Sequence, residues 1–401
     1  MKINLNSFLT SVSLALDAVE EELFKTTTNH SKRVAYIALR LGELYNLDDK
    51  TRFDLCSYAI VHDNGIIQAY QKSKKEKKSL ELEGLESHCE IGEKNIKDFP
   101  FLTRQENIIL YHHERYDGKG FYGKKEDEIP LLSQLIYIAD MLDTNFELNN
   151  ITLSTQEAVI NYVINSKGTL FSPMMVEKFL ELSQITSFWF DLDKTNILNI
   201  YSKRIPKFNI DITYKKMLEI SHIFSTIIDA KSEFTARHTN ELVEKAKIIA
   251  DYYELNEDKS YKLQIAANLH DLGKLSTPID ILEKPGPLTK DELFIMKKHA
   301  YFTFSILDTI KGFEEINKIA SSHHERLDGK GYPFGLEDIQ LDFEERLLAC
   351  LDVYQALIEE RPYRKAMSHQ DAIKILNSTV ESKILDKEII KSIDLVFRES
   401  A

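Results

Sequence analysis

Histidine and aspartate residues recur as an ordered set in each half of this chain. The paired residues lie 208 to 212 positions apart, with His62 and His270 at one extreme and Asp140 and Asp352 at the other. Ten of the twelve histidines belong to these two sets, which random placement would not produce. The set in the second half consists of His238, His270, Asp271, His299, His323, His324 and Asp352. The set in the first half consists of His30, His62, Asp63, His88, His112, His113 and Asp140.

These residue types indicate metal chemistry at phosphorus. Imidazole nitrogen and carboxylate oxygen together suit first-row transition metals such as iron or manganese. Seven ligands are too many for one ion but suit two ions that share a carboxylate, and Asp271 is the natural bridge because it adjoins His270. Two such ions can hold a hydroxide between them and brace both oxygens of an in-line displacement. The second set therefore predicts a dinuclear hydrolase site in which Asp271 is a catalytic residue.

The segments that carry the two sets have helical periodicity. After His30, apolar residues recur on one helical face at Val34, Ile37, Ala38 and Leu41, and the same spacing follows His238. Neither half contains a convincing series of alternating strands, so the predicted fold class is all-α. Loops are predicted at residues 71–84, 116–129, 277–289 and 327–341. Pro206 cannot continue a helix, which places a connector there and predicts two tandem helical domains, 1–205 and 206–401.

Composition narrows the class of protein. The formal net charge of −13 argues against a DNA-binding protein, which would usually present a basic surface. There is no apolar run long enough for a transmembrane helix, and the N-terminus is typical of a first helix and not of a signal peptide. The three cysteines are scattered, which favours a reducing cytoplasm over a disulfide framework. We therefore expect a cytoplasmic protein with a small-molecule partner, no DNA and no membrane association.

Longer motifs in the second half resemble the HD-GYP family, a branch of the HD-domain metal phosphohydrolases. The resemblance rests on the stretch from His270 to Lys274, on His299, on the stretch from His323 to Pro333, and on the stretch from Arg361 to Arg364. It implies a bacterial signalling enzyme that hydrolyses cyclic di-GMP to pGpG or GMP. It also implies that the seven residues of the second set bind the metals.

The resemblance further assigns substrate contacts. It places the basic residues that hold the phosphates at Lys274, Arg361 and Arg364, and charge-assisted contacts of this kind suit a cyclic dinucleotide with two phosphodiester anions. Tyr332 lies in the Gly329–Pro333 loop, where it would either contact the substrate or pack against the pocket wall. Some relatives carry a glutamate four residues before the first histidine, which holds a third metal. Phe234 occupies that position here, with Glu233 beside it, so two metals are expected.

The first half keeps its ligand set but loses the basic residues. Ile66 stands where the second half has Lys274, and Asn149 and Thr152 stand where it has Arg361 and Arg364. Each lost charge-assisted contact would cost on the order of 1.5–3 kcal/mol. We favour a metal-binding partner domain of weak activity. An enzyme for another phosphate ester and a regulatory receptor are the alternatives.

Other functions remain open from sequence alone. The chain could be a cyclic-dinucleotide receptor that binds without turnover, or a phosphohydrolase for cyclic GMP-AMP or another nucleotide. The sequence also leaves open whether the chain forms a homodimer.

Overall fold

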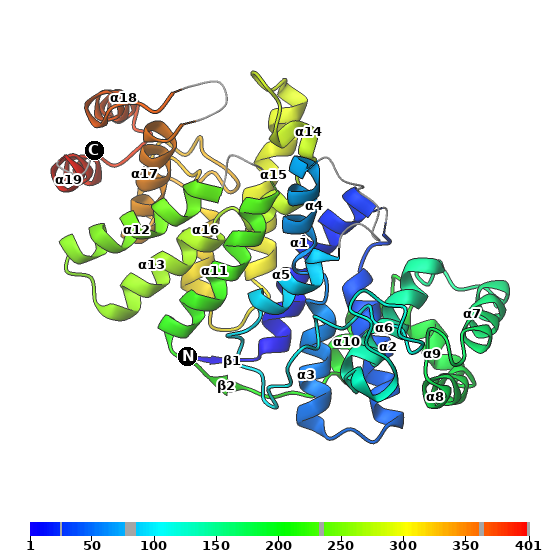
Figure 1. The fold of residues 1–401 in the computed structure, drawn as a ribbon. Helices are drawn as coiled ribbons and strands as arrows, with labels where there is room; N and C mark the ends of the chain where they lie inside the picture. Colours follow the sequence, from blue (N-terminus) through cyan, green and yellow to red (C-terminus); the bar gives the residue numbers. More distant parts are fainter. Residues whose placement is uncertain (25, 77–85, 232–235, 361–364, 399–401) are drawn as a thin grey trace. The chain divides into compact units, whose positions relative to one another are not determined.

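The computed structural model describes residues 1–24, 26–76, 86–231, 236–360 and 365–398. Contacts divide the chain into two compact units. We call Ile3–Ile210 the first domain, and Asp211–Ala401, together with Met1–Lys2, the second domain. The colours of Figure 1 run from blue to green through the first domain and from green to red through the second.

The first domain is built around α2, whose residues from His30 to Gly42 are all buried. This helix packs against α3 and α6, which carry or precede other residues of the first set. Side-chain caps begin several helices; Asp48, for example, accepts hydrogen bonds from two backbone amides at the start of α3. The helices are α1 (Leu5–Phe24), α2 (His30–Leu44), α3 (Asp49–Ile60), α4 (Ile66–Glu76), α5 (Ser87–Asn95), η2 (Glu126–Glu128), α6 (Leu131–Asn145), α7 (Leu153–Asn165), α8 (Pro173–Ser183), α9 (Thr186–Asp191) and α10 (Ile197–Arg204).

The second domain repeats this plan. Its α12 packs against α13 and α17, as α2 packs against α3 and α6 in the first domain. A capping box between Thr289 and Glu292 begins α15. The helices are α11 (Tyr214–Ala230), α12 (Ala236–Tyr252), α13 (Glu257–Leu269), η3 (Leu272–Ser276), α14 (Ile279–Leu282), α15 (Lys290–Leu307), α16 (Glu314–Ser321), η4 (Asp338–Gln340), α17 (Phe343–Ile358), α18 (His369–Glu381) and α19 (Lys387–Phe397).

The all-α prediction is confirmed. Within the described ranges the only sheet is a pair of two-residue strands, β1 (Lys2–Ile3) and β2 (Ile210–Asp211). None of the described helices is long and apolar enough to cross a membrane.

Two of the predicted loops are partly helical. The predicted loop at 71–84 was wrong at its start, because α4 continues through Lys72, Lys74 and Lys75 to Glu76. Residues 77–84 of this prediction lie outside the described residues. No proline or glycine interrupts this stretch, and Ile66, Ile67 and Ala69 bury one face of the helix. The short α14 lies inside the predicted loop at 277–289. The predicted loops at 116–129 and 327–341 contain no helix longer than the three-residue turns η2 and η4, and a single β-bridge joins Asp328 to Glu337 in the second of them.

Candidate metal centres

The second set of predicted ligands comes together from five separate segments of the second domain. His238 projects from α12, His299 from α15 and Asp352 from α17. His270 and Asp271 occupy the junction between α13 and η3, and His323 and His324 follow the end of α16. All are buried apart from His324, which is half-buried. The start of α12, the ends of α13 and α16, and the middle of α15 and α17 thus bring ligands that are far apart in sequence to one centre.

One group of ligands gathers around Asp352. Its Oδ1 lies 3.0 Å from Nε2 of His238 and 3.9 Å from Nε2 of His270. His270 in turn lies 3.1 Å from Oδ2 of Asp271. Two imidazoles and a carboxylate therefore face one point, as ligands of a single cation would.

A second group gathers on the other side of Asp271. Nε2 of His299 lies 3.3 Å from Nε2 of His323, and the ring of His324 completes a cluster of three histidines. Oδ1 of Asp271 lies 3.6 Å from His299 and 3.9 Å from His323. Asp271 thus faces one group with each carboxylate oxygen, which is the arrangement predicted for a bridging ligand.

The buried Oδ1 of Asp271 has no hydrogen-bond partner among the described residues. Leaving a buried carboxylate oxygen unsatisfied costs several kcal/mol as an order of magnitude. A cation between the two groups would remove that penalty. The donor set and this unsatisfied oxygen together fit a divalent transition metal.

Backbone carbonyls orient the ligating rings. Nδ1 of His270 donates to the oxygen of Ala267 (2.7 Å), and Nδ1 of His323 donates to that of Ala320 (2.7 Å). His299 donates in the same way to Met296 (2.6 Å). Because a carbonyl oxygen only accepts, Nδ1 carries a proton in each ring, and Nε2 is the nitrogen that faces the centre and binds a metal when the ring is neutral.

The electrostatics favour the neutral, metal-binding form of the three histidines on the Asp271 Oδ1 side. Burial lowers the pKa of His299 to about 4 and that of His324 to about 3, so both rings are neutral near pH 7. Burial also opposes the charged form of His270, but the charges of Asp271 and Asp352 raise its pKa. Burial acts against ionisation of Asp271, yet the charges of His270 and Lys274 hold its pKa well below the usual range. Neutral imidazoles beside ionised carboxylates are the forms that bind metals.

His238 is oriented by a carboxylate and not by a carbonyl. Its Nδ1 lies 2.9 Å from Oε2 of Glu359, at the end of α17. Burial opposes the charged ring, but hydrogen bonds and charges from Asp352 and Glu359 raise the pKa of His238 to about 10. Metal binding at Nε2 of His238 would therefore release a proton. Sequence reasoning missed Glu359, which lies two helical turns after Asp352 and on the same face.

The predicted substrate contacts are placed in part. Nζ of Lys274 reaches the centre and lies 2.5 Å from Oδ2 of Asp271. The ring of Tyr332 packs over that of His324, with centroids 4.7 Å apart. Arg361 and Arg364 lie outside the described residues, as do Glu233 and Phe234. The structure thus brings Lys274 and Tyr332 to the ligands.

The loop that carries Tyr332 is held by Glu325, which sequence reasoning also missed. This buried carboxylate accepts hydrogen bonds from the backbone amides of Phe334 (2.6 Å), Gly335 (3.1 Å) and Leu336 (3.0 Å). Glu114 does the same in the first domain, where it accepts from the amides of Tyr122 and Lys124. The recurrence of this acid directly after both His-His pairs was the signal available in the sequence.

The first set of predicted ligands also converges. Oδ1 of Asp140 lies 3.4 Å from Nε2 of His30 and 3.7 Å from that of His62. Oδ1 of Asp63 lies 3.3 Å from Nε2 of His88 and 3.4 Å from that of His112. Each pair of imidazoles thus faces one carboxylate oxygen, on the same plan as in the second domain.

His113 joins this centre less closely, since its Nδ1 lies 3.9 Å from Oδ2 of Asp140. Ile66, which stands in place of the lysine of the second copy, is buried. At this position the first centre thus lacks the ammonium group that Lys274 supplies in the second.

Sequence reasoning also missed Glu20 and Cys89, which lie against the histidines of the first centre. Glu20 of α1 is 4% exposed. Its Oε2 lies 4.0 Å from Nε2 of His30 and has no hydrogen-bond partner in the described part of the chain. Cys89 of α5 places its Sγ 3.5 Å from Nε2 of His88. Burial would raise the pKa of this thiol, but the charges and hydrogen bonds of His112 and His88 lower it to about 7. Neither residue has an identical counterpart in the second copy, so comparison of the repeats could not reveal them.

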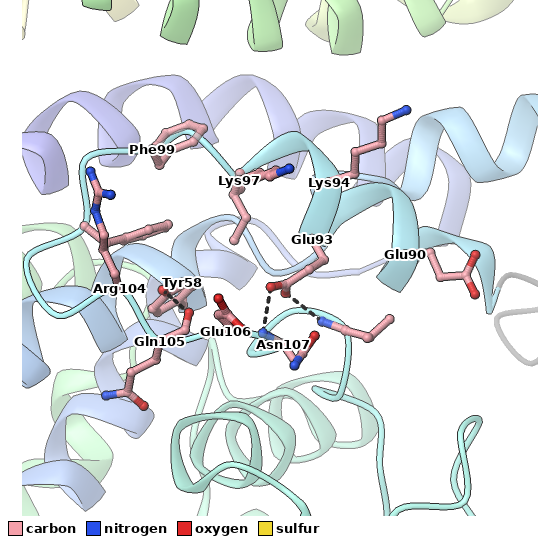
Figure 2. A pocket seen from close by; sticks show the side chains of 13 residues that line it. Tyr58, Glu90, Glu93, Lys94, Lys97, Phe99, Arg104, Gln105, Glu106 and Asn107 are labelled. Atoms are coloured by element: carbon pink, nitrogen blue, oxygen red, sulfur yellow. Dashed lines mark hydrogen bonds between the residues drawn. The ribbon is translucent and has the colours of Figure 1, made fainter.

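A cavity of about 590 Å³ also opens in the first domain (Figure 2). Its lining includes Phe99 and Lys97, and Tyr58, which donates to the backbone oxygen of Gln105 (2.8 Å). Glu93 accepts there from the backbone amide of Asn107 (2.7 Å). None of the predicted metal ligands lines this cavity. The chemistry predicted for the chain therefore does not lie in it.

Both centres lie in regions of the chain that match known protein families. Two sequence families, each described as an HD domain, match residues 27–145 and 222–389. The 3'3'-cGAMP-specific phosphodiesterase 1 of Vibrio cholerae is 28% identical over 99% of this chain and 92% of its own length. The 3'3'-cGAMP-specific phosphodiesterase 3 of the same organism is 30% identical over 75% of this chain and 65% of its own length.

Similarity to cyclic di-GMP enzymes covers less of the chain. A cyclic di-GMP phosphodiesterase of Thermotoga maritima is 32% identical over 44% of this chain and 48% of its own length. Among solved structures, a cyclic GMP-AMP-specific phosphodiesterase of V. cholerae matches with a TM-score of 0.68 and 22% identity. The match covers 99% of this chain and 98% of that one. At this identity the match speaks for a shared fold.

Proposed function

The chain belongs to the HD-domain family, as a tandem member of its HD-GYP branch, and from this premise we propose that residues 206–401 form a metal-dependent phosphodiesterase for cyclic dinucleotides. The observation that carries the proposal is Asp271, whose two carboxylate oxygens face two separate groups of buried imidazoles. Iron or manganese is the proposed metal, on the chemistry of the nitrogen and oxygen donors.

The side chains have distinct roles in this proposal. Divalent ions bound here would supply the positive charge that lowers the pKa of water and neutralises the phosphate. Asp271 would bridge the two groups of ligands, and the carbonyl-anchored rings of His270, His299 and His323 would keep their Nε2 atoms aimed at the centre. Because these groups are held before substrate arrives, little reorganisation is needed during the reaction.

The substrate would be held beside the ligands. Lys274 is positioned to donate to a phosphate oxygen, because its Nζ already lies against the carboxylate of Asp271. Tyr332 would form the pocket wall over His324 and exclude water from that side. Arg361 and Arg364 are proposed as further phosphate contacts on the family resemblance alone, since they lie outside the described residues.

For the substrate we propose 3'3'-cGAMP, with cyclic di-GMP as the second candidate. The sequence motifs by themselves favoured cyclic di-GMP. The relative that aligns over 99% of this chain is specific for 3'3'-cGAMP, whereas the cyclic di-GMP phosphodiesterase of T. maritima aligns over 44% of it. Similarity that includes both domains supports 3'3'-cGAMP more strongly than similarity of one domain supports cyclic di-GMP.

The test is a side-by-side assay of full-length protein reconstituted with Fe²⁺ or Mn²⁺ under anaerobic conditions. The two dinucleotides are compared by kcat/KM, and we expect the higher value for 3'3'-cGAMP. The Asp271→Ala variant should lose hydrolysis, whereas the matched Asp63→Ala variant of the first domain should retain it.

Two results would overturn the proposal. Tight binding of either dinucleotide without turnover by fully metal-loaded protein would identify a receptor. Hydrolysis that disappears with Asp63→Ala and survives with Asp271→Ala would place the reaction in the first domain.

A further inference from the structure

The centre of the first domain contains a thiol that the second centre lacks. Cys89 directly follows the predicted ligand His88 in α5, and Ala300 follows the corresponding His299 in α15. Cys89 is fully buried and forms no disulfide. A buried free cysteine is often no more than a small apolar side chain, so its surroundings decide its role.

Those surroundings are metal-ligand groups. Sγ of Cys89 and one ring nitrogen each of His88, His112 and His113 all lie within 4.8 Å of one another. Oδ1 of Asp63 faces the same point, at 3.3 Å from His88 and 3.4 Å from His112. This oxygen is buried, has no hydrogen-bond partner among the described residues, and belongs to a side chain that is 10% exposed.

Four of the six separations between the proposed donor atoms match those around a tetrahedral ion. Zn–N and Zn–O bonds of about 2.0–2.1 Å and a Zn–S bond of about 2.3 Å give N–N and N–O edges of roughly 3.4 Å and an N–S edge of roughly 3.6 Å. The Nε2 atoms of His88 and His112 are 3.4 Å apart, and Sγ of Cys89 is 3.5 Å from Nε2 of His88. The two edges to Asp63 agree equally well.

We propose that the first domain binds a metal ion through Asp63, His88, His112 and the thiolate of Cys89, and that the sulfur ligand makes this site selective for zinc. Binding would release to solvent the thiol proton and any proton on Nε2 of His88 or His112, as the bonds from sulfur and nitrogen to the metal form. Soft thiolate ligands shift a site toward zinc, whereas a site built from imidazole and carboxylate alone also suits iron and manganese. The two domains would thus hold different metals despite their common ligand plan.

The experiment uses Co²⁺ as a spectroscopic substitute for zinc in the full-length protein. A thiolate bound to Co²⁺ produces a near-ultraviolet charge-transfer band, which imidazole and carboxylate ligands do not. We expect the band in the wild-type protein, its loss in Cys89→Ala, and its retention in Cys56→Ser. Alanine is the residue that the second copy carries at this position, and Cys56 is a buried cysteine of the first domain outside the cluster.

Zinc affinity provides a second measurement that does not depend on activity. We expect Cys89→Ala to bind one zinc per chain at least tenfold more weakly while Mn²⁺ binding is unchanged. If the alanine variant does not fold, the volume-conserving Cys89→Ser variant replaces it in both measurements. A cobalt-loaded wild-type protein without the band, or a band that persists in Cys89→Ala, would overturn the proposal. These outcomes do not depend on whether the second domain hydrolyses a dinucleotide.

Discussion

The two centres share their predicted histidine and aspartate ligands but differ in the groups around them. In the second, Lys274 supplies a positive charge beside Asp271, whereas Ile66 stands at the equivalent position in the first. In the first, Arg33 pairs with Asp143, the carboxylate that also orients His30. Single side chains next to the ligands can therefore separate a catalytic centre from one that only holds metal.

Replacing Lys274 by isoleucine makes the second centre resemble the first at this position. We expect kcat/KM for the dinucleotide to fall roughly 10- to 100-fold, because one charge-assisted contact to phosphate contributes about 1.5–3 kcal/mol. Metal content should stay unchanged, since the lysine is not a ligand. The check is steady-state kinetics together with metal analysis. Unchanged kinetics would remove Lys274 from the substrate contacts.

Asp229 of α11 gives a prediction about pH. Burial, together with the charge of Asp271, raises the pKa of this carboxyl to about 7. The hydrogen bond from Thr239 opposes the shift. Since the unfolded value is about 3.9, its contribution to stability is full below about pH 4 and is lost as pH rises through 7. Asp229→Asn should therefore gain stability over the wild type as pH rises, by at most about 1.4 kcal/mol per pH unit. Urea unfolding of both proteins from pH 4 to 8 in the presence of a chelator measures this gain. A difference in the free energy of unfolding that does not change with pH would contradict the prediction.

At the scale of elements, the sequence predicts the helices better than the supports of the ligands. The spacing of apolar residues after His30 and His238 is local, so it identifies α2 and α12 directly. Supporting groups depend on how helices meet. His30 is oriented by Asp143, three residues after Asp140, but His238 by Glu359, seven residues after Asp352. Because these positions do not correspond, aligning the two copies cannot find them.

The loop from Gly329 to Leu336 depends on one buried carboxylate. Glu325→Gln removes an acceptor oxygen and its charge from three backbone amides, so we expect a loss of about 1.5–3 kcal/mol in stability. Tyr332 should lose its fixed place over His324, and KM should rise. The matched Glu114→Gln variant should cost comparable stability but leave dinucleotide hydrolysis unchanged. Equal effects of both variants on KM would argue against a local role for the loop.

At the scale of the whole molecule, each centre is built entirely within one domain. All seven predicted ligands of the first centre lie between residues 3 and 210, and all seven of the second lie beyond residue 211. Each domain has its own buried apolar core around its own central helix. Since none of the predicted ligands of either centre comes from the other domain, we expect the two metal sites to fill and empty independently.

Metal removal tests this independence. Metal ions that bind only the folded state stabilise it. At a free metal concentration of 100 times the dissociation constant, each site contributes about 2.7 kcal/mol. A chelator should therefore lower the melting temperature of the wild-type protein, and the shift should be smaller at low pH, where protonated ligands hold metal less tightly. Asp63→Asn should abolish the part of the shift that belongs to the first domain, and Asp271→Asn the part that belongs to the second. The double variant should melt alike with and without chelator, because distant sites contribute additively. If either single variant abolished the entire shift, the two centres would be coupled, and the separate roles assigned to the two domains would fail.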